Sequence, residues 1–205
     1  PEFEETSNQR SFRQSYMKEI NKAYRYDESI GIMDIGEDKK ISLQDIYVPL
    51  KFSKNDSELY ISNDHIDLIE LFSNSNNVVL SGKPGSGKTT LSRFIISSLS
   101  SYDLTLMSEN FGRKIPLYIK LRDYKLEDIK SFNNFFKLFI DTMSNILKIN
   151  IPKEYIEFYL RNGWCFLIFD GIDEVGNKKN RLKIRNYILK NFSKYNKNNY
   201  ILVTS

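Results

Sequence analysis

The sequence predicts an α/β fold in which helices cover both faces of a central parallel sheet. Short apolar runs that suit buried strands alternate with longer segments whose apolar residues repeat every three or four positions. A glycine-rich loop lies between one of these runs and the helical pattern that follows it. Strands alternating with helices favour parallel pairing with right-handed crossovers, and the chain has no internal repeat that would indicate another architecture.

The glycine-rich loop is the strongest functional signal. Residues Gly82 to Thr89 fit the phosphate-binding pattern G-x-x-x-x-G-K-[ST] at every fixed position. An apolar strand at residues 77–80 precedes the loop, and helical spacing follows from Leu91. In this order of elements, backbone N–H groups and the positive end of the helix face the phosphates. The loop therefore predicts a nucleoside triphosphate site and a P-loop NTPase three-layer sandwich.

Each residue of the loop has an expected role. We expect Lys88 to reach the β- and γ-phosphates and the Thr89 hydroxyl to ligate Mg²⁺. Thr90 is a candidate for contact with the α-phosphate, with an ordinary place at the start of the helix as the alternative. The other predicted nucleotide-binding residues are Gly82, Lys83, Pro84, Gly85, Ser86 and Gly87.

A second chemical signal follows the apolar run at residues 166–169. Asp170 falls where a buried strand would end, and the carboxyl ends of such strands carry ligand-binding groups in α/β sheets. We expect Asp170, with Thr89, to hold Mg²⁺. Glu174 and Asp173 are the catalytic candidates, placed to orient or deprotonate an attacking water. Alone the pattern also suits a strand capped at the surface, but beside the loop it favours an NTPase.

The remaining elements follow from periodicity and turn residues. Phe12, Tyr16, Ile20 and Tyr24 lie four residues apart and predict a helix at residues 10–26. Residues 46–52 alternate around Pro49, which suits an edge strand or an extended arm because proline lacks a backbone donor. The other predicted helices run through Ile66, Ile69 and Phe72 with Asn63 or Asp64 as the cap, and over residues 132–147, 152–161 and 177–195. The other predicted strands are residues 115–121, 164–169 and 200–204.

Composition limits the class of protein. The net charge of +4 comes from 30 basic and 26 acidic residues that are interspersed, which does not favour a nucleic-acid partner. No apolar stretch approaches the roughly 20 residues that a membrane helix needs, and the N-terminus lacks the pattern of a signal peptide, so we expect a cytoplasmic protein without a membrane partner. His65 is the only histidine, which excludes a multi-histidine metal site, and Cys165 is expected to be buried. We interpret residues 1–3 as a cloning remnant, 4–62 as an N-terminal helix and extended arm, and 63–205 as the NTPase core.

Four ordered motifs resemble those of the NACHT branch of the STAND signalling NTPases. They are GKPGSGKTT at residues 82–90, IPLYIKLRDY at 115–124, LIFDGIDEV at 167–175 and YILVTS at 200–205. The third is the most discriminating, because Gly171 separates Asp170 from the acidic pair, whereas related NB-ARC proteins place paired acidic residues directly at the strand end. The arm Tyr47-Val48-Pro49-Leu50 is also similar to bacterial members, so the resemblance covers residues 41–205.

The resemblance implies roles for particular positions. Asp170 takes the Mg²⁺-associated role and Glu174 the catalytic acidic role, and Thr204 with Ser205 becomes the sensor. Arg122 occupies the L-R-D position, where it either pairs with an acidic neighbour or lies near the phosphates. Candidates for contact with the base are Ile46, Tyr47, Val48 and Pro49, although edge packing explains the same alternation. The last strand is expected between the phosphate-loop strand and the Asp170 strand.

The family pattern continues past the sensor strand with an arginine, a fifth strand, a helical lid and a winged-helix domain. Since the chain ends at Ser205, we expect a C-terminally truncated core of such a domain. Nucleotide affinity and turnover are expected to be lower than in an intact protein, because without a lid water reaches the γ-phosphate.

Three functions remain open. The resemblance implies a signalling ATPase that binds and slowly hydrolyses ATP with Mg²⁺ to switch its assembly state, in innate immune or antiphage defence. Such a fragment would be monomeric, and the full-length protein would self-associate on activation. The alternatives are a non-hydrolysing scaffold that depends on ATP or ADP, and a nucleic-acid-dependent ATPase of the AAA+ type. The preference for ATP over GTP follows from the resemblance, since residues 196–199 fail the guanine-reading pattern N-K-x-D.

Overall fold

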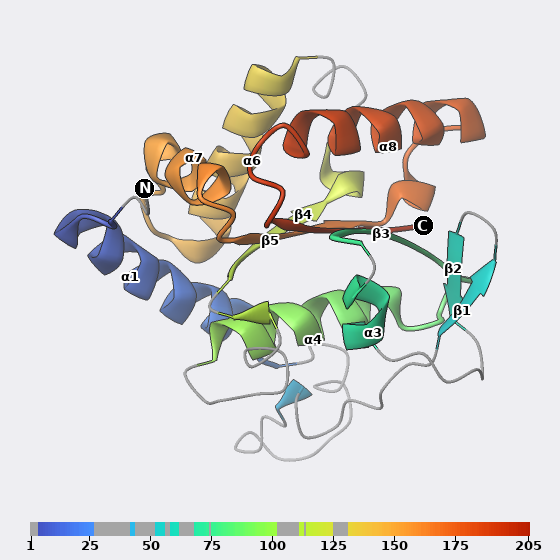
Figure 1. Ribbon diagram of the computed structural model, residues 1–205, viewed down its shortest axis with the longest axis horizontal. Coiled ribbons are helices and arrows are strands. Elements are labelled where there is room, and N and C mark those ends of the chain that lie inside the picture. The colour runs from blue at the N-terminus through green and yellow to red at the C-terminus, as the bar shows by residue number, and fades with distance from the viewer. Residues whose placement is uncertain are drawn as a thin grey trace.

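The protein is a three-layer α/β sandwich (Figure 1). The computed structural model describes residues 4–26, 42–43, 52–55, 58–61, 68–73, 75–101, 111–112, 114–124 and 131–205. The helices are α1 (Ser7–Tyr24), α3 (Leu68–Ser73), α4 (Lys88–Ser100), α6 (Phe132–Leu147), α7 (Lys153–Arg161) and α8 (Lys178–Phe192). The strands are β1 (Phe52–Asn55), β2 (Glu58–Ile61), β3 (Asn77–Ser81), β4 (Ile115–Lys120), β5 (Cys165–Asp170) and β6 (Tyr200–Thr204). Two short 3-10 helices, η2 (Leu121–Asp123) and η4 (Ile172–Glu174), follow β4 and β5.

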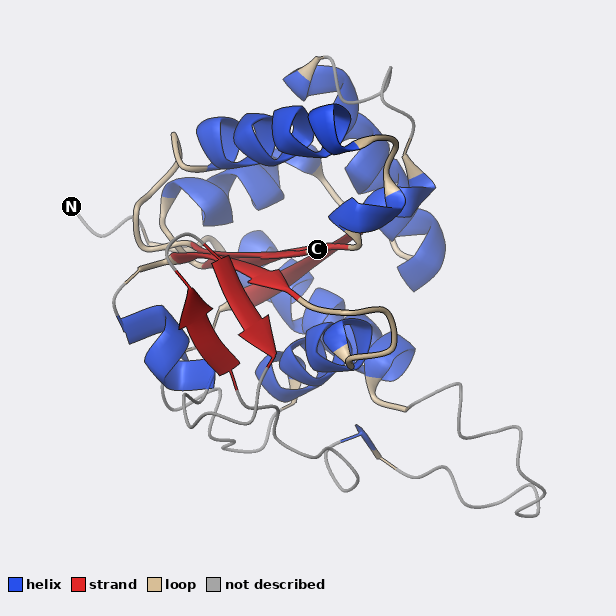
Figure 2. Cartoon of the chain, turned by 90° about the vertical axis from the view of Figure 1, so that its right-hand side faces the viewer, coloured by secondary structure: helices blue, strands red, loops and turns tan. Residues whose placement is uncertain are grey.

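One sheet with the strand order β1-β2-β3-β6-β5-β4 forms the middle layer. Strands β3, β6, β5 and β4 are all parallel, which confirms the predicted fold class, and β6 lies between β3 and β5 as expected. Helices α6, α7 and α8 cover one face and α1, α3 and α4 the other; Figure 2 shows the sheet nearly edge-on between these layers. All four strands therefore present their carboxyl ends at one edge of the sheet.

The hairpin of β1 and β2 extends this sheet and was not predicted. Strand β2 pairs in parallel with β3, whereas β1 runs antiparallel to β2 (Figure 2). Each strand has only four residues, too few for alternation to stand out in the sequence. Of the predicted edge strand at residues 46–52, only Phe52 is among the described residues, and β1 begins there. The other residues of that predicted strand, the caps Asn63 and Asp64, and His65 lie outside the described residues.

Local capping explains the starts of two helices that differ from the predicted bounds. Helix α1 begins three residues earlier than predicted, because Thr6 and Gln9 form a capping box in which each side chain bonds the backbone N–H of the other residue. Asn177 caps α8 by accepting a hydrogen bond from Asn180 N, so that helix begins one residue later than predicted.

The core is continuous across both faces of the sheet. Strand β5 is buried along its whole length, and the aromatic stripe of α6 packs into the core through residues that include Phe135, Phe136 and Phe139. Cys165 is fully buried as predicted, and burial raises the pKa of its thiol, so it remains an unreactive small side chain.

A partly buried ionic cluster connects the start of α1 to α7. The Glu5 carboxylate accepts hydrogen bonds from Arg13 Nε (2.9 Å) and Nη2 (3.0 Å), and the Tyr159 hydroxyl lies 3.0 Å from Glu5 Oε1 and 2.6 Å from Gln9 O. Burial alone would raise the pKa of Glu5, but the hydrogen bonds from Arg13 and Tyr159 and the charges of Arg13 and Arg10 outweigh it and lower that pKa.

This cluster predicts a pH-dependent contribution to stability. A carboxyl whose pKa is lowered on folding stabilises the protein above its unfolded pKa, and this stabilisation is lost as pH falls through the folded value. We expect Glu5→Gln to lower the free energy of unfolding by about 1–3 kcal/mol near neutral pH. The difference from the unmodified protein should shrink on acidification below about pH 4. Urea unfolding measured across this range checks it, and a pH-independent difference would contradict the assignment.

Candidate nucleotide-binding site

The phosphate loop connects β3 to α4 in the predicted order. Gly85 and Gly87 have φ angles of 77° and 89°, in the left-handed region that glycine adopts without a steric cost. Gly87 is the N-cap of α4, so the loop delivers its backbone directly to the positive end of the helix. A Cβ added at Gly85 would meet nothing within 4 Å, which leaves this side of the loop open to an incoming group.

The side chains of the loop fit an anionic ligand. Lys88 is 9% exposed, and its Nζ donates to Gly82 O (2.6 Å) and Lys83 O (3.2 Å). Within the described residues, Lys88 has no carboxylate partner, and the buried Ser86 Oγ has no hydrogen-bond partner. A buried ammonium that meets only carbonyl oxygens is satisfied better by a phosphate, and an orphaned hydroxyl can donate to the same group.

Asp170 lies at the carboxyl end of β5 and is 6% exposed. Three hydroxyl groups hold its carboxylate. Thr204 Oγ1 donates to Oδ1 at 2.6 Å, Tyr118 OH donates to Oδ2 at 2.8 Å, and Ser92 Oγ lies 3.4 Å from Oδ1. These donors come from β6, β4 and α4, so three different elements hold the carboxylate.

The register of the sheet explains the closeness of these groups. Lys120 pairs with Asp170, Phe169 pairs with Val203, and Leu80 pairs with Thr204, so the ends of the four strands are level. Gly171 N donates to Thr204 Oγ1 at 2.9 Å, which leaves the hydroxyl proton of Thr204 for Asp170. Thr204 is completely buried; its predicted partner Ser205 bonds through its backbone to Leu80 O and to Gly82 N.

Glu174 lies on η4, which follows a turn at Gly171 that only glycine adopts easily. Gly171 has a φ of 80°, and a Cβ added there would come within 3.0 Å of Glu174 Oε1. Glu174 is 46% exposed, and its Oε2 lies 3.5 Å from Arg122 Nη1 at the end of β4. Of the two alternatives for Arg122, the structure contains the pairing with acidic neighbours, since Asp123 Oδ1 also lies 3.9 Å from its Nε.

The structure thus brings together part of the predicted set and adds two residues to it. Four of the predicted residues lie at the edge of the sheet where the parallel strands have their carboxyl ends: Lys88, Asp170, Thr204 and Ser205. The predicted base contacts lie outside the described residues: Ile46, Tyr47, Val48 and Pro49. Thr89 is exposed on the first turn of α4 and Thr90 is half-buried beside it. Sequence reasoning missed Ser92 and Tyr118. Ser92 lies one helical turn after Lys88, a spacing that could have indicated it, but Tyr118 looked like an ordinary strand residue.

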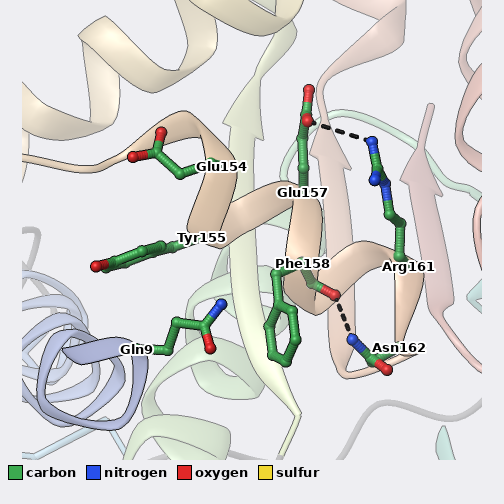
Figure 3. Close-up of a pocket in the computed structure, with 7 residues that line it drawn as sticks. All are labelled: Gln9, Glu154, Tyr155, Glu157, Phe158, Arg161 and Asn162. Atoms are coloured by element: carbon green, nitrogen blue, oxygen red, sulfur yellow. Dashed lines mark hydrogen bonds and ion pairs between the residues drawn. The ribbon is translucent and has the colours of Figure 1, made fainter. Parts of the chain in front are cut away.

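A surface pocket of about 360 Å³ lies elsewhere, between the start of α1 and α7 (Figure 3). Two residues that line it, Arg161 and Asn162, shortly precede β5 in the chain. The pocket therefore lies near the amino end of β5, whereas Asp170 lies at the carboxyl end. Arg161 pairs with Glu157 at 3.5 Å, and Asn162 Nδ2 donates to Phe158 O at 2.8 Å. These polar groups already have partners, and we assign this pocket no part in the site.

A strand, a glycine-rich loop, a helix and a buried acidic strand end in this arrangement define a P-loop NTPase. The profile of the family described as "ATPase family associated with various cellular activities (AAA)" matches residues 78–205, and the chain belongs to this family. A search of curated proteins found no match. In the part of the chain that the structure describes, no helix is long and apolar enough to cross a membrane.

Lys88 provides the simplest test of the site. We expect Lys88→Ala to weaken triphosphate binding by about 10- to 100-fold, because a charge-assisted contact to phosphate is lost. Lys190→Ala, which removes an exposed lysine from α8, is the control for the change in net charge and should bind as the unmodified protein does. Calorimetry measures both affinities, and equal values for the two variants would refute the assignment.

Gly171 allows the turn before Glu174 to be tested separately. We expect Gly171→Ala to lower the free energy of unfolding by about 1–2 kcal/mol through its left-handed backbone, and to displace Glu174. Gly112→Ala is matched to it, with a φ of 66° and nothing within 4 Å of an added Cβ. Both should be destabilised in chemical denaturation, but only Gly171→Ala should change phosphate release.

Proposed function

We propose that this domain is the nucleotide-binding core of a NACHT-type STAND signalling ATPase, which binds and slowly hydrolyses ATP with Mg²⁺ to switch its assembly state. The main support is the acidic strand end, where buried Asp170 is followed by a left-handed glycine and by Glu174 on η4. This is the geometry of the D-G-x-D-E motif, the most discriminating part of the resemblance. Innate immune or antiphage signalling in the cytoplasm is the context that the resemblance suggests.

The residues of the site divide the chemistry among them. The loop amides, Lys88 and Ser86 bind and orient the phosphates, and the helix dipole of α4 adds to the attraction. Thr89 and Asp170 would hold Mg²⁺, which when bound neutralises charge on the β- and γ-phosphates. Glu174 orients the attacking water or accepts its proton, with Asp173 as the second acidic candidate. Such hydrolysis depends on positioning and charge neutralisation more than on covalent chemistry.

The ion pair with Arg122 suits a slow enzyme. While Arg122 lies 3.5 Å from Glu174, the carboxylate points to a cation instead of a water. Both side chains are about half exposed, so solvent screens the pair and Glu174 can leave it at little cost.

Replacement of Glu174 tests hydrolysis directly. We expect Glu174→Gln to slow Mg²⁺-dependent phosphate release by about 10²- to 10⁴-fold, because general-base catalysis is lost, while ATP affinity is retained. Glu154→Gln on α7, an exposed change of the same kind, should hydrolyse ATP as the unmodified protein does. Unchanged turnover in Glu174→Gln would remove this residue from the mechanism.

The same assays separate the other two functions. Tight binding without phosphate release would favour the scaffold that uses nucleotide only to hold one conformation. The match to the AAA family is equally compatible with a nucleic-acid-dependent ATPase. Stimulation of phosphate release by DNA or RNA at low salt would favour that class over a signalling switch, and a flat response would count against it.

A further inference from the structure

Tyr118 holds the side of the Asp170 carboxylate that no other described residue reaches. Thr204 and Ser92 both approach Oδ1, whereas Oδ2 receives its hydrogen bond from Tyr118 OH at 2.8 Å. Tyr118 is 2% exposed. The phenol is the donor in this pair, because a carboxylate oxygen accepts hydrogen bonds.

The sheet places Tyr118 where its hydroxyl can make this contact. Tyr118 precedes Lys120, the register partner of Asp170, by two residues, so Tyr118 and Asp170 are diagonal neighbours on one face of the sheet. A long side chain is needed to cover a diagonal distance of about 7–8 Å. A phenol has that reach, and a phenylalanine in its place would fill the same volume without a donor.

The ring of Tyr118 in turn packs against the N-terminal helix. Its centroid lies 5.2 Å from that of Tyr24 on α1, with an interplanar angle of 85°. This edge-to-face arrangement is the one that aromatic pairs favour. Helix α1 precedes the segment that matches the AAA family, so a residue outside that segment contacts the residue that orients Asp170.

Helix α1 is hydrogen-bonded to β4, the strand that contains Tyr118, and to α4. Tyr16 OH donates to Pro116 O on β4 at 2.9 Å. Asn21 Nδ2 lies 3.2 Å from Ser97 O and 3.2 Å from Ser100 Oγ, both on α4, the helix that begins at the phosphate loop. These bonds fix α1 along and across its axis, so the Tyr24 ring has a defined place against Tyr118.

We propose that Tyr118 is a positioning residue for the Asp170 carboxylate and that α1 keeps Tyr118 in place through Tyr24. Rotation of a carboxylate about its last torsion is soft, and donors on one oxygen alone leave this rotation free. A second donor on Oδ2 fixes the plane and directs the remaining lone pairs of the carboxylate outward. In metal sites, residues that orient a ligand in this way affect metal affinity strongly. The link to the metal rests on the proposed function.

The test compares nucleotide affinity with and without metal. The β,γ-imido analogue of ATP is titrated into each variant by calorimetry, first with saturating Mg²⁺ and then in EDTA, and the ratio of the two affinities measures the contribution of the metal. We expect Tyr118→Phe to lower this ratio by about 10-fold and to leave the affinity in EDTA unchanged. Tyr24→Leu, which removes the ring from α1, should lower the ratio less, and Tyr24→Phe should restore it.

Tyr124→Phe is the control, because it removes another buried tyrosine hydroxyl, which bonds Thr142 on α6, and touches neither α1 nor Asp170. It should keep the ratio of the unmodified protein. The proposal is overturned if folded Tyr118→Phe keeps that ratio, or if Tyr124→Phe lowers it as much. If Tyr118→Phe does not fold, the two Tyr24 variants decide, and equal ratios for them overturn the proposal.

Two reference variants distinguish a failure of this inference from a failure of the proposed function on which it rests. If the unmodified protein binds the analogue equally well with and without Mg²⁺, or if Lys88→Ala binds it normally, the proposed function itself fails. If Asp170→Asn lowers the ratio while Tyr118→Phe and Tyr24→Leu do not, the site is correct and only the role of Tyr118 and α1 is wrong.

Discussion

The carboxylate of Asp170 is the group around which the rest of this structure is arranged. An ionised carboxylate with 6% exposure is strongly destabilising unless hydrogen bonds replace the water it has lost. Thr204, Tyr118 and Ser92 provide these bonds from β6, β4 and α4. The level register of the parallel strands is a requirement of this cluster, because a shift by one residue would turn Thr204 to the other face of the sheet.

The phosphate loop shows a complementary kind of order. Its cation Lys88 is also buried, but it is satisfied only by the carbonyl groups of Gly82 and Lys83, and Ser86 Oγ is left without a partner among the described residues. The Asp170 carboxylate is therefore hydrogen-bonded on both oxygens before a ligand arrives, while on the phosphate side the Ser86 hydroxyl is still without a partner among the described residues. An anion adds contacts to the loop without breaking the bonds that hold Asp170.

Much of this arrangement was predictable from the chain. The loop pattern at residues 82–89 needs a fixed spacing that few sequences contain by chance, and the apolar run before Asp170 has the length of a buried strand and is followed by a glycine. The β1–β2 hairpin could not be predicted, because its pairing with β3 is a tertiary contact and its strands have four residues each. Helix α1 begins earlier than predicted because Thr6 and Gln9 form a capping box, which the apolar spacing alone does not show.

The sequence by itself determined the class of the domain, the phosphate loop and the strand that ends in Asp170, because each depends on residues close together in the chain. Only the tertiary structure decided which hydroxyl groups hold that carboxylate. Tyr118, Asp170 and Thr204 are separated by 52 and 34 residues in the chain, and their contact depends on strand order and register. The same holds for α1, whose Tyr24 reaches Tyr118 only because packing against α4 and β4 brings it there.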